Sequence, residues 1–394
     1  MNSKQSKFLL FFLVVLAACL THFASDIYAP AIPAISIALQ TPIDMVQWSM
    51  AIYLFGVTPS LLIYGPLSEG YGRKLPLMIG LGIMLIGSVL CSFATSIDML
   101  LWGRLIQGLG AGAAAGLWRS IFRDVFSGEE LAQYVSYLVI FITFIVPAAP
   151  ALGGLLQTYI GWRSNFLFMC FYTLITFFLI AAGLKETNVH RHKERMRFSF
   201  IKATYLTLFK SPIFMGITVC TFLSYGAFFS WFVTGPVLLI EKAGISSIDF
   251  GLITFLGGGF AYALSGWLNG KYVKKFGIPN MLRFGWAWMT FAGLLMLLGY
   301  FFFGINVWAI AVPVIIFYFG STFIWPNAFA AAFTPFGKIA GYAGGLYSFM
   351  QLGGGAVLGS LMSYLPSKNQ VPLALVKIIC SALSWIIYER VSKD

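Results

Sequence analysis

Long apolar stretches recur along the whole chain, and short polar segments separate them. Each stretch is about 20 residues long, which is enough for a helix to cross the roughly 30 Å hydrocarbon layer of a membrane. Twelve candidate spans result, at residues 8–28, 47–67, 76–94, 99–119, 133–157, 164–184, 213–237, 248–269, 283–303, 307–328, 340–364 and 371–388. The pattern predicts an all-α polytopic membrane protein with twelve transmembrane helices.

Basic residues are distributed unevenly between the two sides of these spans. One set of loops, together with both chain ends, holds most of the Lys and Arg residues, whereas the opposite loops hold only Arg163, Lys242 and Lys368. Because cytoplasmic loops are enriched in Lys and Arg, both termini and the 185–212 loop are predicted to be cytoplasmic. The basic residues that give the net charge of +12 therefore indicate how the chain is oriented in the membrane, and no nucleic-acid partner is expected.

One long polar connection divides the chain into two halves. It predicts an N-terminal six-helix bundle at residues 1–184, a cytoplasmic linker at 185–212 and a C-terminal six-helix bundle at 213–394. The loops after the second and eighth spans also match at one constant offset, which pairs Gly65, Leu67, Tyr71, Arg73 and Lys74 with Gly266, Leu268, Tyr272, Lys274 and Lys275. A repeated loop at the same place in each half is typical of secondary transporters.

The composition excludes several other classes of protein. Hydrophobic residues make up 59% of the chain and charged residues 10%, whereas a soluble domain carries about 25% charged residues. The five cysteines all lie in apolar stretches and have no metal-site spacing. No nucleophile motif or soluble catalytic insertion is present, so we expect neither an enzyme nor a bound metal or cofactor.

The first span carries an acidic residue that packing alone does not explain. Asp26 lies in an apolar segment, and Pro30 and Pro33 break the helix beyond it. A charged side chain in the hydrocarbon costs roughly 2.5 to 3.5 kcal/mol on insertion scales, so such residues usually face an interior pathway. Asp26 is therefore a candidate proton carrier. The alternative is a carboxylate at the helix end near the outer interface.

Two further side chains are placed to act with Asp26. Arg104 in the fourth span falls at a similar depth, since that span runs in the opposite direction, and it is the candidate counter-ion; the alternative is a fixed structural cation. His22 lies four residues before Asp26, on the same helix face. Histidine titrates near neutral pH, so His22 is either a hydrogen-bonded wall residue or a proton relay.

Glycine and proline positions predict close helix packing and bending. Gly108, Gly112 and Gly116 recur every fourth residue in the fourth span and form a small-residue stripe for helix contact. A phosphate-binding loop is excluded there, because no strand precedes the glycines and no Lys follows at the required position. Pro147 and Pro150 predict a kink in the fifth span or a neighbour that accommodates them.

Polar and aromatic residues of several spans are candidates for lining a central substrate site. The candidates are His22, Ser25, Asp26, Tyr53, Tyr225, Trp231, Tyr318 and Asn327. Aromatic residues in membrane proteins also face lipid or pack against other helices, which is the alternative for each of them. Lys377 in the last span is expected to extend to the outer interface.

Taken together, these motifs resemble the major facilitator superfamily over essentially the whole chain. The motifs are Asp26-Ile27-Tyr28-Ala29-Pro30-Ala31-Ile32-Pro33, Gly65-Pro66-Leu67-Ser68-Glu69-Gly70-Tyr71-Gly72-Arg73-Lys74, Arg104 with Gln107 and Gly108, and Pro150-Ala151-Leu152-Gly153-Gly154. Within the superfamily the chain resembles drug/proton antiporters of the bicyclomycin-resistance and chloramphenicol-efflux type. The resemblance implies the major facilitator fold, with two six-helix bundles.

The resemblance also implies which residues gate transport. The implied gating residues are Gly65, Glu69, Gly72, Arg73, Lys74, Pro150, Gly153 and Gly154. Four positions depart from the family pattern. Glu69 and Gly70 stand where the family carries Asp and then Arg, and Ala149 replaces a glycine before Pro150. Ala18 stands where some multidrug relatives carry a second acidic residue.

We therefore expect a proton-coupled secondary transporter that exports amphipathic small molecules, such as drugs, across the bacterial inner membrane. Asp26 and Arg104 are the expected proton-coupling pair, the proton gradient replaces any cofactor, and a monomer in the lipid bilayer is expected to suffice. The alternative is a carrier of the same fold for one endogenous metabolite, such as a siderophore, exported or imported.

Overall fold

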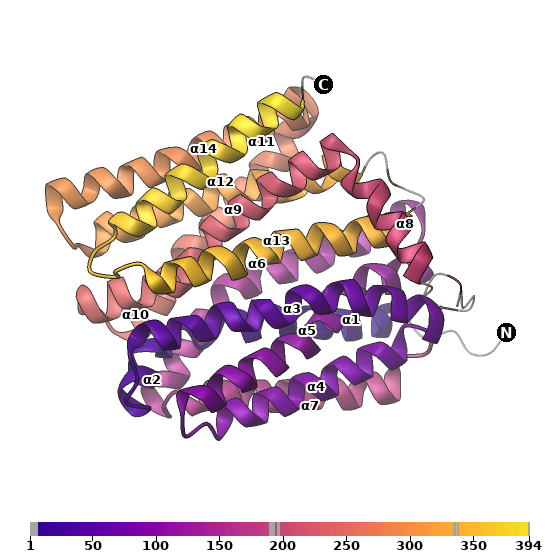
Figure 1. Ribbon diagram of the computed structural model, residues 1–394, viewed down its shortest axis with the longest axis horizontal. Coiled ribbons are helices and arrows are strands. Elements are labelled where there is room, and N and C mark those ends of the chain that lie inside the picture. The colour runs from indigo at the N-terminus through magenta and orange to yellow at the C-terminus, as the bar shows by residue number, and fades with distance from the viewer. Residues whose placement is uncertain (1–6, 189–193, 195–197, 334–335, 337–338, 393–394) are drawn as a thin grey trace.

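The computed structural model describes residues 7–188, 194, 198–333, 336 and 339–392. The first group of helices is coloured indigo to magenta in Figure 1. Its elements are α1 (Lys7–Asp26), the 3₁₀ turn η1 (Ala29–Ala31), α2 (Ile32–Ala38), α3 (Ile43–Tyr71), α4 (Lys74–Ser92), α5 (Ile97–Val125), α6 (Gly128–Tyr159) and α7 (Arg163–Gly183).

The second group of helices runs from red to yellow in the same view. Its elements are α8 (Phe198–Phe209), α9 (Pro212–Pro236), the π-helical turn η3 (Val237–Lys242), α10 (Ser247–Leu252), the π-helical turn η4 (Ile253–Gly258), α11 (Gly259–Phe303), α12 (Val307–Phe333), α13 (Ala340–Tyr364) and α14 (Val371–Val391). The two groups lie side by side, and they meet where α3 packs on α13 and α6 packs on α10 (Figure 1).

The described helices account for twelve membrane crossings. Nine described segments are long and apolar enough to cross a membrane, and one of them, Ser247–Phe303, contains two crossings that Gly277 separates. The other two crossings are α5 and α13, which are long enough but contain more polar residues and glycines. The predicted all-α membrane fold of twelve helices in two bundles is confirmed.

The connection between the bundles contains a helix that the sequence pattern did not predict. The predicted linker, residues 185–212, includes α8, which packs against α9 and α13. Residues 189–193 and 195–197 of this linker, like both extreme ends of the chain, lie outside the described residues. The predicted bundle limits at residues 184 and 213 stay a prediction.

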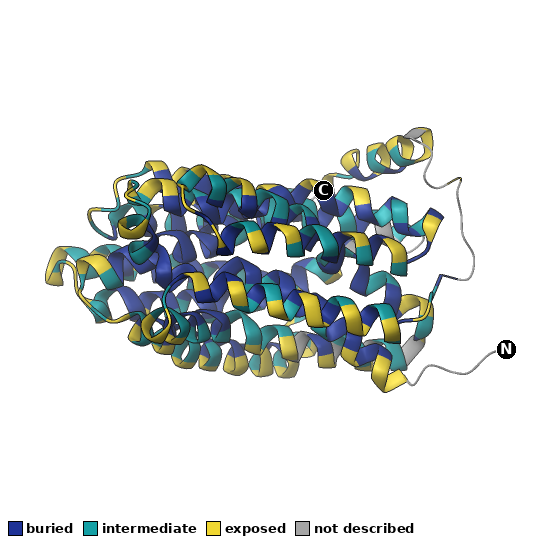
Figure 2. Cartoon of the chain, turned by 90° about the horizontal axis from the view of Figure 1, so that it is seen from below, coloured by how far each residue is buried: buried dark blue, intermediate teal, exposed yellow. Residues whose placement is uncertain are grey.

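Burial follows the arrangement of the bundles. Figure 2 shows buried residues along the interior faces of the helices and exposed residues along the outside. The exposed positions include large apolar side chains, such as Phe171, Trp267 and Phe302, which are more than half exposed. A water-soluble monomer rarely carries such a continuous apolar surface, so this exterior is that of helices that face lipid.

The proline positions affect the chain in two different ways. α1 ends at Asp26, and the segment that contains Pro30 and Pro33 continues as η1 and α2, so the predicted break in the first span is confirmed. α6 instead runs without interruption through Pro147 and Pro150. The neighbour that accommodates these prolines is α10. Its Gly251 lies against the carbonyl oxygen of Pro150, and the absence of a side chain there allows the close contact.

The internal repeat differs in register from the sequence match. Gly72 follows α3 with a φ of 94°, and the equivalent turn inside α11 is at Gly277, with a φ of 77°. Such positive φ angles favour glycine at both turns. The constant offset of the sequence match instead assigns Val273 to Gly72. That match is therefore wrong by one helical turn, because short Gly, Tyr and Lys motifs recur nearby.

Candidate functional site

Arg104 lies at the centre of the first bundle, where its side chain is 1% exposed. Its Nη1 donates to the carbonyl oxygen of Ala24 at 2.8 Å and to Oε1 of Gln107, and its Nε donates to the carbonyl oxygen of Ser49 at 3.3 Å. Gln107 is itself fixed, since its Nε2 donates to Oγ of Ser88 at 2.8 Å. Backbone and amide oxygens therefore hold the guanidinium in place.

Two tyrosine rings complete the environment of Arg104. The guanidinium carbon lies 4.5 Å from the ring centre of Tyr28 and 4.3 Å from that of Tyr53. The Tyr53 hydroxyl donates to the carbonyl oxygen of Thr21 at 2.9 Å, and the Tyr28 hydroxyl and the Ser49 hydroxyl lie 2.7 Å apart. Cation–π contact and hydrogen bonds thus lock the residues next to Asp26.

Asp26 is the last residue of α1 and is 4% exposed. Its Oδ1 is buried and has no hydrogen-bond partner among the described residues. Asp26 and Arg104 interact electrostatically, yet within the described part of the chain no ion pair joins them. The expected direct counter-ion contact is therefore not formed in this structure: Nε and Nη1 of Arg104 are held by carbonyl and amide oxygens, and its buried Nη2 has no hydrogen-bond partner among the described residues.

Tyrosines of both bundles lie within electrostatic range of Asp26. Its carboxyl group interacts electrostatically with Tyr53 of α3, Tyr225 of α9, Tyr262 of α11 and Tyr318 of α12. The Tyr318 hydroxyl is buried and has no hydrogen-bond partner in the described structure. The structure thus brings Asp26, Tyr53, Tyr225 and Tyr318 together. It adds Tyr262, which no sequence motif marked.

The other predicted substrate-site residues lie in different surroundings. Trp231 stacks on Phe250 with the ring centres 5.6 Å apart. Asn327 donates to Oδ1 of Asn269 at 2.7 Å and to the carbonyl oxygen of Phe323 at 2.8 Å, so it links α12 to α11.

Ser25 and His22 remain on α1 beside Asp26. Ser25 is buried, and His22 is partly exposed and interacts electrostatically with Arg119. The Ser25 side chain lies beside the Asp26 carboxyl group and interacts with it. The roles of His22, Ser25, Trp231 and Asn327 in substrate binding stay predictions.

Arg73 forms the hub of a charge cluster where α3, α4 and α5 end or begin. Its side chain is 4% exposed, and it pairs with Glu69 at 3.0 Å and with Asp124 at 2.8 Å. Its Nη1 also donates to Oγ of Ser68 at 2.7 Å. Burial lowers the pKa of Arg73, but the hydrogen bonds and charges of Asp124 and Glu69 outweigh burial and raise its pKa above the usual value.

Glu186, just beyond α7, closes the same cluster from the other side. Its carboxylate accepts from the backbone N–H of Arg73 at 2.7 Å and from that of Lys74 at 3.2 Å. Gly72 lies directly against this carboxylate. Lys74 donates through Nζ to the carbonyl oxygen of Ala181 at 2.7 Å. No sequence motif marks Asp124 or Glu186, since both lie far along the chain from Arg73.

The predicted gating motif of α6 lies where α6 meets both α1 and α10. Gly153 lies directly against the carbonyl oxygen of Ile27, and Gly154 against that of Ser247. No side chain fits at either contact. Gly65, by contrast, has open space around it. The α6 motif therefore joins the two bundles next to Asp26, whereas Gly65 makes no such contact.

The end of the molecule that holds η1, α2 and α10 is closed by contacts between the bundles. Nε2 of Gln47 donates to the carbonyl oxygen of Val233 at 2.9 Å, and Oγ of Ser247 donates to that of Pro30 at 3.1 Å. The rings of Trp48 and Tyr364 also meet, with centres 5.6 Å apart. Since α1 ends at Asp26 near this closure, the site is covered from that side.

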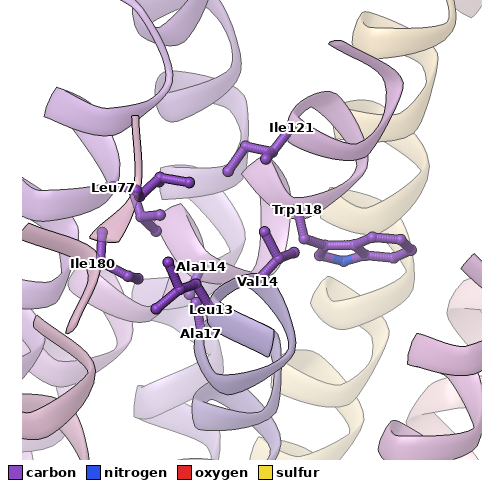
Figure 3. Close-up of a pocket in the computed structure, with 9 residues that line it drawn as sticks. Leu13, Val14, Ala17, Leu77, Ala114, Trp118, Ile121 and Ile180 are labelled. Carbon is purple, nitrogen blue, oxygen red and sulfur yellow. The ribbon is translucent and has the colours of Figure 1, made fainter. Parts of the chain in front are cut away.

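The hollow in Figure 3 is a separate feature inside the first bundle. It is lined by Leu13, Val14, Ala17, Leu77, Ala114, Trp118, Ile121, Ile180 and Leu184. These side chains offer no charged group, so the hollow is a packing defect between α1, α4, α5 and α7 rather than the candidate site.

Lys377 does not extend to the outer interface, and that prediction is wrong. Its side chain is 0% exposed. Nζ lies 3.6 Å from the ring centre of Phe317 and donates to the carbonyl oxygen of Ala227 at 3.3 Å. The sequence does not specify which face of α14 meets the bundle, and Lys377 lies on the face that packs against α9 and α12.

Comparisons with known proteins agree with this architecture. The chain is 29% identical to multidrug resistance protein D of Escherichia coli K12, over 96% of this chain and 95% of the relative. It is 24% identical to the bicyclomycin resistance protein homolog of Haemophilus influenzae, over 98% of this chain and 97% of the relative.

Solved structures and a family profile extend the comparison. The xylose transporter of E. coli, in a partially occluded, inward-open conformation, has the same fold, with a TM-score of 0.74 and 14% identity over 97% of each chain. Residues 14–360 match the profile of the Major Facilitator Superfamily. The chain belongs to the Major Facilitator Superfamily.

Proposed function

We propose that this protein exports amphipathic small molecules, including drugs, across the bacterial inner membrane in exchange for protons. Members of its superfamily are transporters rather than enzymes. Support for export of drugs comes from relatives over nearly the whole length that are named for multidrug and bicyclomycin resistance.

The state of Asp26 is the observation that carries the proposal. Its carboxyl group is buried, its Oδ1 has no partner among the described residues, and Arg104 is held by carbonyl oxygens rather than by Asp26. A permanent ion pair would favour the charged carboxylate, whereas burial favours the protonated form. Without such a pair, Asp26 is free to exchange a proton for the substrate.

The driving force is sufficient for such an exchange. One elementary charge that crosses the membrane at 100 mV supplies about 2.3 kcal/mol. Entry of one proton through Asp26 is therefore worth about a fortyfold gradient of a neutral substrate, since about 1.4 kcal/mol corresponds to a tenfold ratio. The tyrosines of both bundles around Asp26 provide the aromatic wall against which an amphipathic substrate binds.

The orientation and assembly form part of the same proposal. Both termini and the linker at 185–212 lie in the cytoplasm, in accord with the distribution of basic residues. The bundles at 1–184 and 213–394 rock about the site between them, and the Arg73 cluster and the α6 glycines gate the two ends. A monomer in the lipid bilayer suffices, because one chain supplies every residue of the candidate site.

A siderophore or other endogenous metabolite as the sole substrate is not proposed. None of the relatives described above carries a name that points to such a substrate.

The test begins with a substrate screen and continues with Asp26→Asn. Growth inhibition by a compound panel that includes bicyclomycin and chloramphenicol, with and without expression, identifies a substrate. Purified wild-type protein should then release protons when that substrate is added, and vesicles with a pH gradient should show efflux. Asp26→Asn should abolish both signals, because the amide cannot titrate, while substrate binding survives.

The matched control is Asp44→Asn, which makes the same change at an exposed position in the first turn of α3. This control should leave proton release and efflux unchanged. Efflux that stays coupled to the pH gradient in Asp26→Asn would show that another group carries the proton.

A further inference from the structure

A second arginine of α5 has an environment unlike that of Arg104. Arg119 lies about four turns further along the helix. It is partly exposed, and no described carboxylate pairs with it. Its guanidinium carbon lies 4.3 Å from the ring centre of Trp118 and 5.3 Å from that of Phe329. The charge of Arg119 is therefore not neutralised within the described protein.

The neighbours of Arg119 come from both bundles. Phe329 belongs to α12, and Arg119 also interacts electrostatically with His22 of α1 and Tyr347 of α13. A lipid-facing arginine would extend toward the membrane surface. Arg119 instead lies among residues of α1, α5, α12 and α13, where the two bundles face each other.

The acidic residues at the end of α5 and in the neighbouring loops interact with another cation or with backbone N–H groups. Asp124 lies just beyond Arg119 on α5, but its carboxylate binds Arg73 at 2.8 Å. Glu69 binds Arg73 as well, and Glu186 accepts from the backbone of Arg73 and Lys74. These carboxylates therefore interact at the Arg73 cluster, and none of them forms an ion pair with Arg119 in the described part of the chain.

We propose that Arg119 binds the anionic group of the exported molecule, so that the preferred substrates are amphipathic aromatic acids. This inference rests on the proposed export function and names its substrate class. An uncompensated arginine within a transmembrane helix is costly and marks a substrate pathway. Its planar guanidinium binds a carboxylate through two parallel hydrogen bonds. Trp118 and Phe329 offer apolar surface to the aromatic body of the acid.

The charge of Arg119 also discriminates between substrates. A cationic amphiphile meets a like charge at this position, and like-charge contacts disfavour the wrong partner. The membrane potential acts in the same direction, because an interior that is negative drives anions outward. In the exchange of an organic anion for a proton, the membrane potential therefore favours both the entry of the proton and the exit of the anion.

Equilibrium binding of three probes that differ in one functional group tests the proposal. The probes are naphthoate, its neutral amide naphthamide, and the cation naphthylmethylamine. The full-length protein is placed in phosphatidylcholine nanodiscs, and binding is measured by equilibrium dialysis after subtraction of empty nanodiscs. Wild-type protein should bind naphthoate at least about tenfold more tightly than naphthylmethylamine, as expected for one charge-assisted hydrogen-bonded contact.

Variants at Arg119 separate a binding role from a structural one. Arg119→Gln should weaken naphthoate binding by about tenfold to a hundredfold and change naphthamide binding by less than about twofold. Arg119→Lys should retain part of the preference for naphthoate, because lysine keeps the positive charge but lacks the planar guanidinium that forms two parallel hydrogen bonds. Arg123→Gln, one turn further on at an exposed position of α5, is the matched control and should bind all three probes as the wild type does.

Two results would overturn the proposal. One is that wild-type protein binds naphthoate no more tightly than naphthylmethylamine. Absence of any naphthoate binding counts as this result, and no variant is needed to observe it. The other is an Arg119→Gln protein with an unchanged order of affinities. Because binding is measured without a gradient, either result leaves proton-coupled export standing. Failure of export is judged separately with Asp26→Asn.

Discussion

Gly153 of α6 lies directly against the carbonyl oxygen of Ile27, the residue that follows Asp26. The backbones of α6 and of the end of α1 are therefore in contact, and a methyl group at position 153 would overlap the oxygen. The neighbouring Gly154 lies directly against the carbonyl oxygen of Ser247 in the other bundle. These two glycines therefore place α6 in close contact with both the end of α1 and the other bundle.

Gly153→Ala should impair transport through this contact. The added methyl group must displace backbone rather than a flexible side chain, so α6 and the end of α1 should separate, and efflux should fall at least about tenfold if the shift approaches 1 Å at the site. Efflux in vesicles under a pH gradient gives the measurement. Gly82→Ala is the matched control, because a methyl group there meets nothing within 4 Å, and it should leave efflux unchanged.

Arg73→Gln should destabilise the protein. Removal of one member of a buried charge cluster costs about 3 to 5 kcal/mol, because the remaining charges lose their partner, and Glu69 and Asp124 both pair with Arg73. Lys7→Gln removes an exposed pair with Glu130 and should cost about 0 to 1 kcal/mol. Thermal unfolding in detergent compares the two. Equal melting temperatures for both variants would contradict the hub role of Arg73.

Arg104→Lys should lower both stability and transport, although it keeps the positive charge. Arginine donates here to the carbonyl oxygens of Ala24 and Ser49 while its plane contacts the rings of Tyr28 and Tyr53. An ammonium group cannot reproduce this planar fork, so such a replacement is not conservative. The melting temperature and efflux under a pH gradient should both fall, and a Lys variant equal to the wild type would show that only the charge matters.

The sequence predicted features that depend on local chemistry. The break after Asp26 follows from Pro30 and Pro33 close by, and the twelve spans follow from the length of the apolar stretches. Contacts between distant segments were not predictable. Glu186 reaches Arg73 only because α7 returns to the end of α3, and a single sequence gives no measure of that distance.

Helix rotation and register were the other limits. The hydropathy of α14 identifies a span but does not show which face packs inward, so the burial of Lys377 was missed. The repeat was recognised one turn out of register, since short Gly, Tyr and Lys motifs recur every few residues while the turn is fixed by the backbone angles of Gly72 and Gly277. Both errors arise because helix rotation and register are determined by how the helices pack, which the sequence alone does not show.

The burial of Lys377 leads to a stabilising substitution. Its ammonium group contacts the Phe317 ring and the Ala227 carbonyl oxygen, but no described carboxylate pairs with it. Desolvation of an amine that lacks an anionic partner opposes folding. Replacement of buried charged groups by well-packed apolar residues of similar volume is often neutral or stabilising, by about 1 to 4 kcal/mol. Lys377→Met should therefore maintain or raise the melting temperature in detergent.

Lys368→Met supplies the matched comparison for this prediction, because Lys368 is exposed in the loop before α14. That variant should change the melting temperature little, since an exposed lysine pays no desolvation cost on folding. If Lys377→Met instead melts below both the wild type and Lys368→Met, then the cation–π contact with Phe317 and the hydrogen bond to Ala227 outweigh the desolvation of the amine. In that case Lys377 would hold α14 against α9 and α12 as a structural cation.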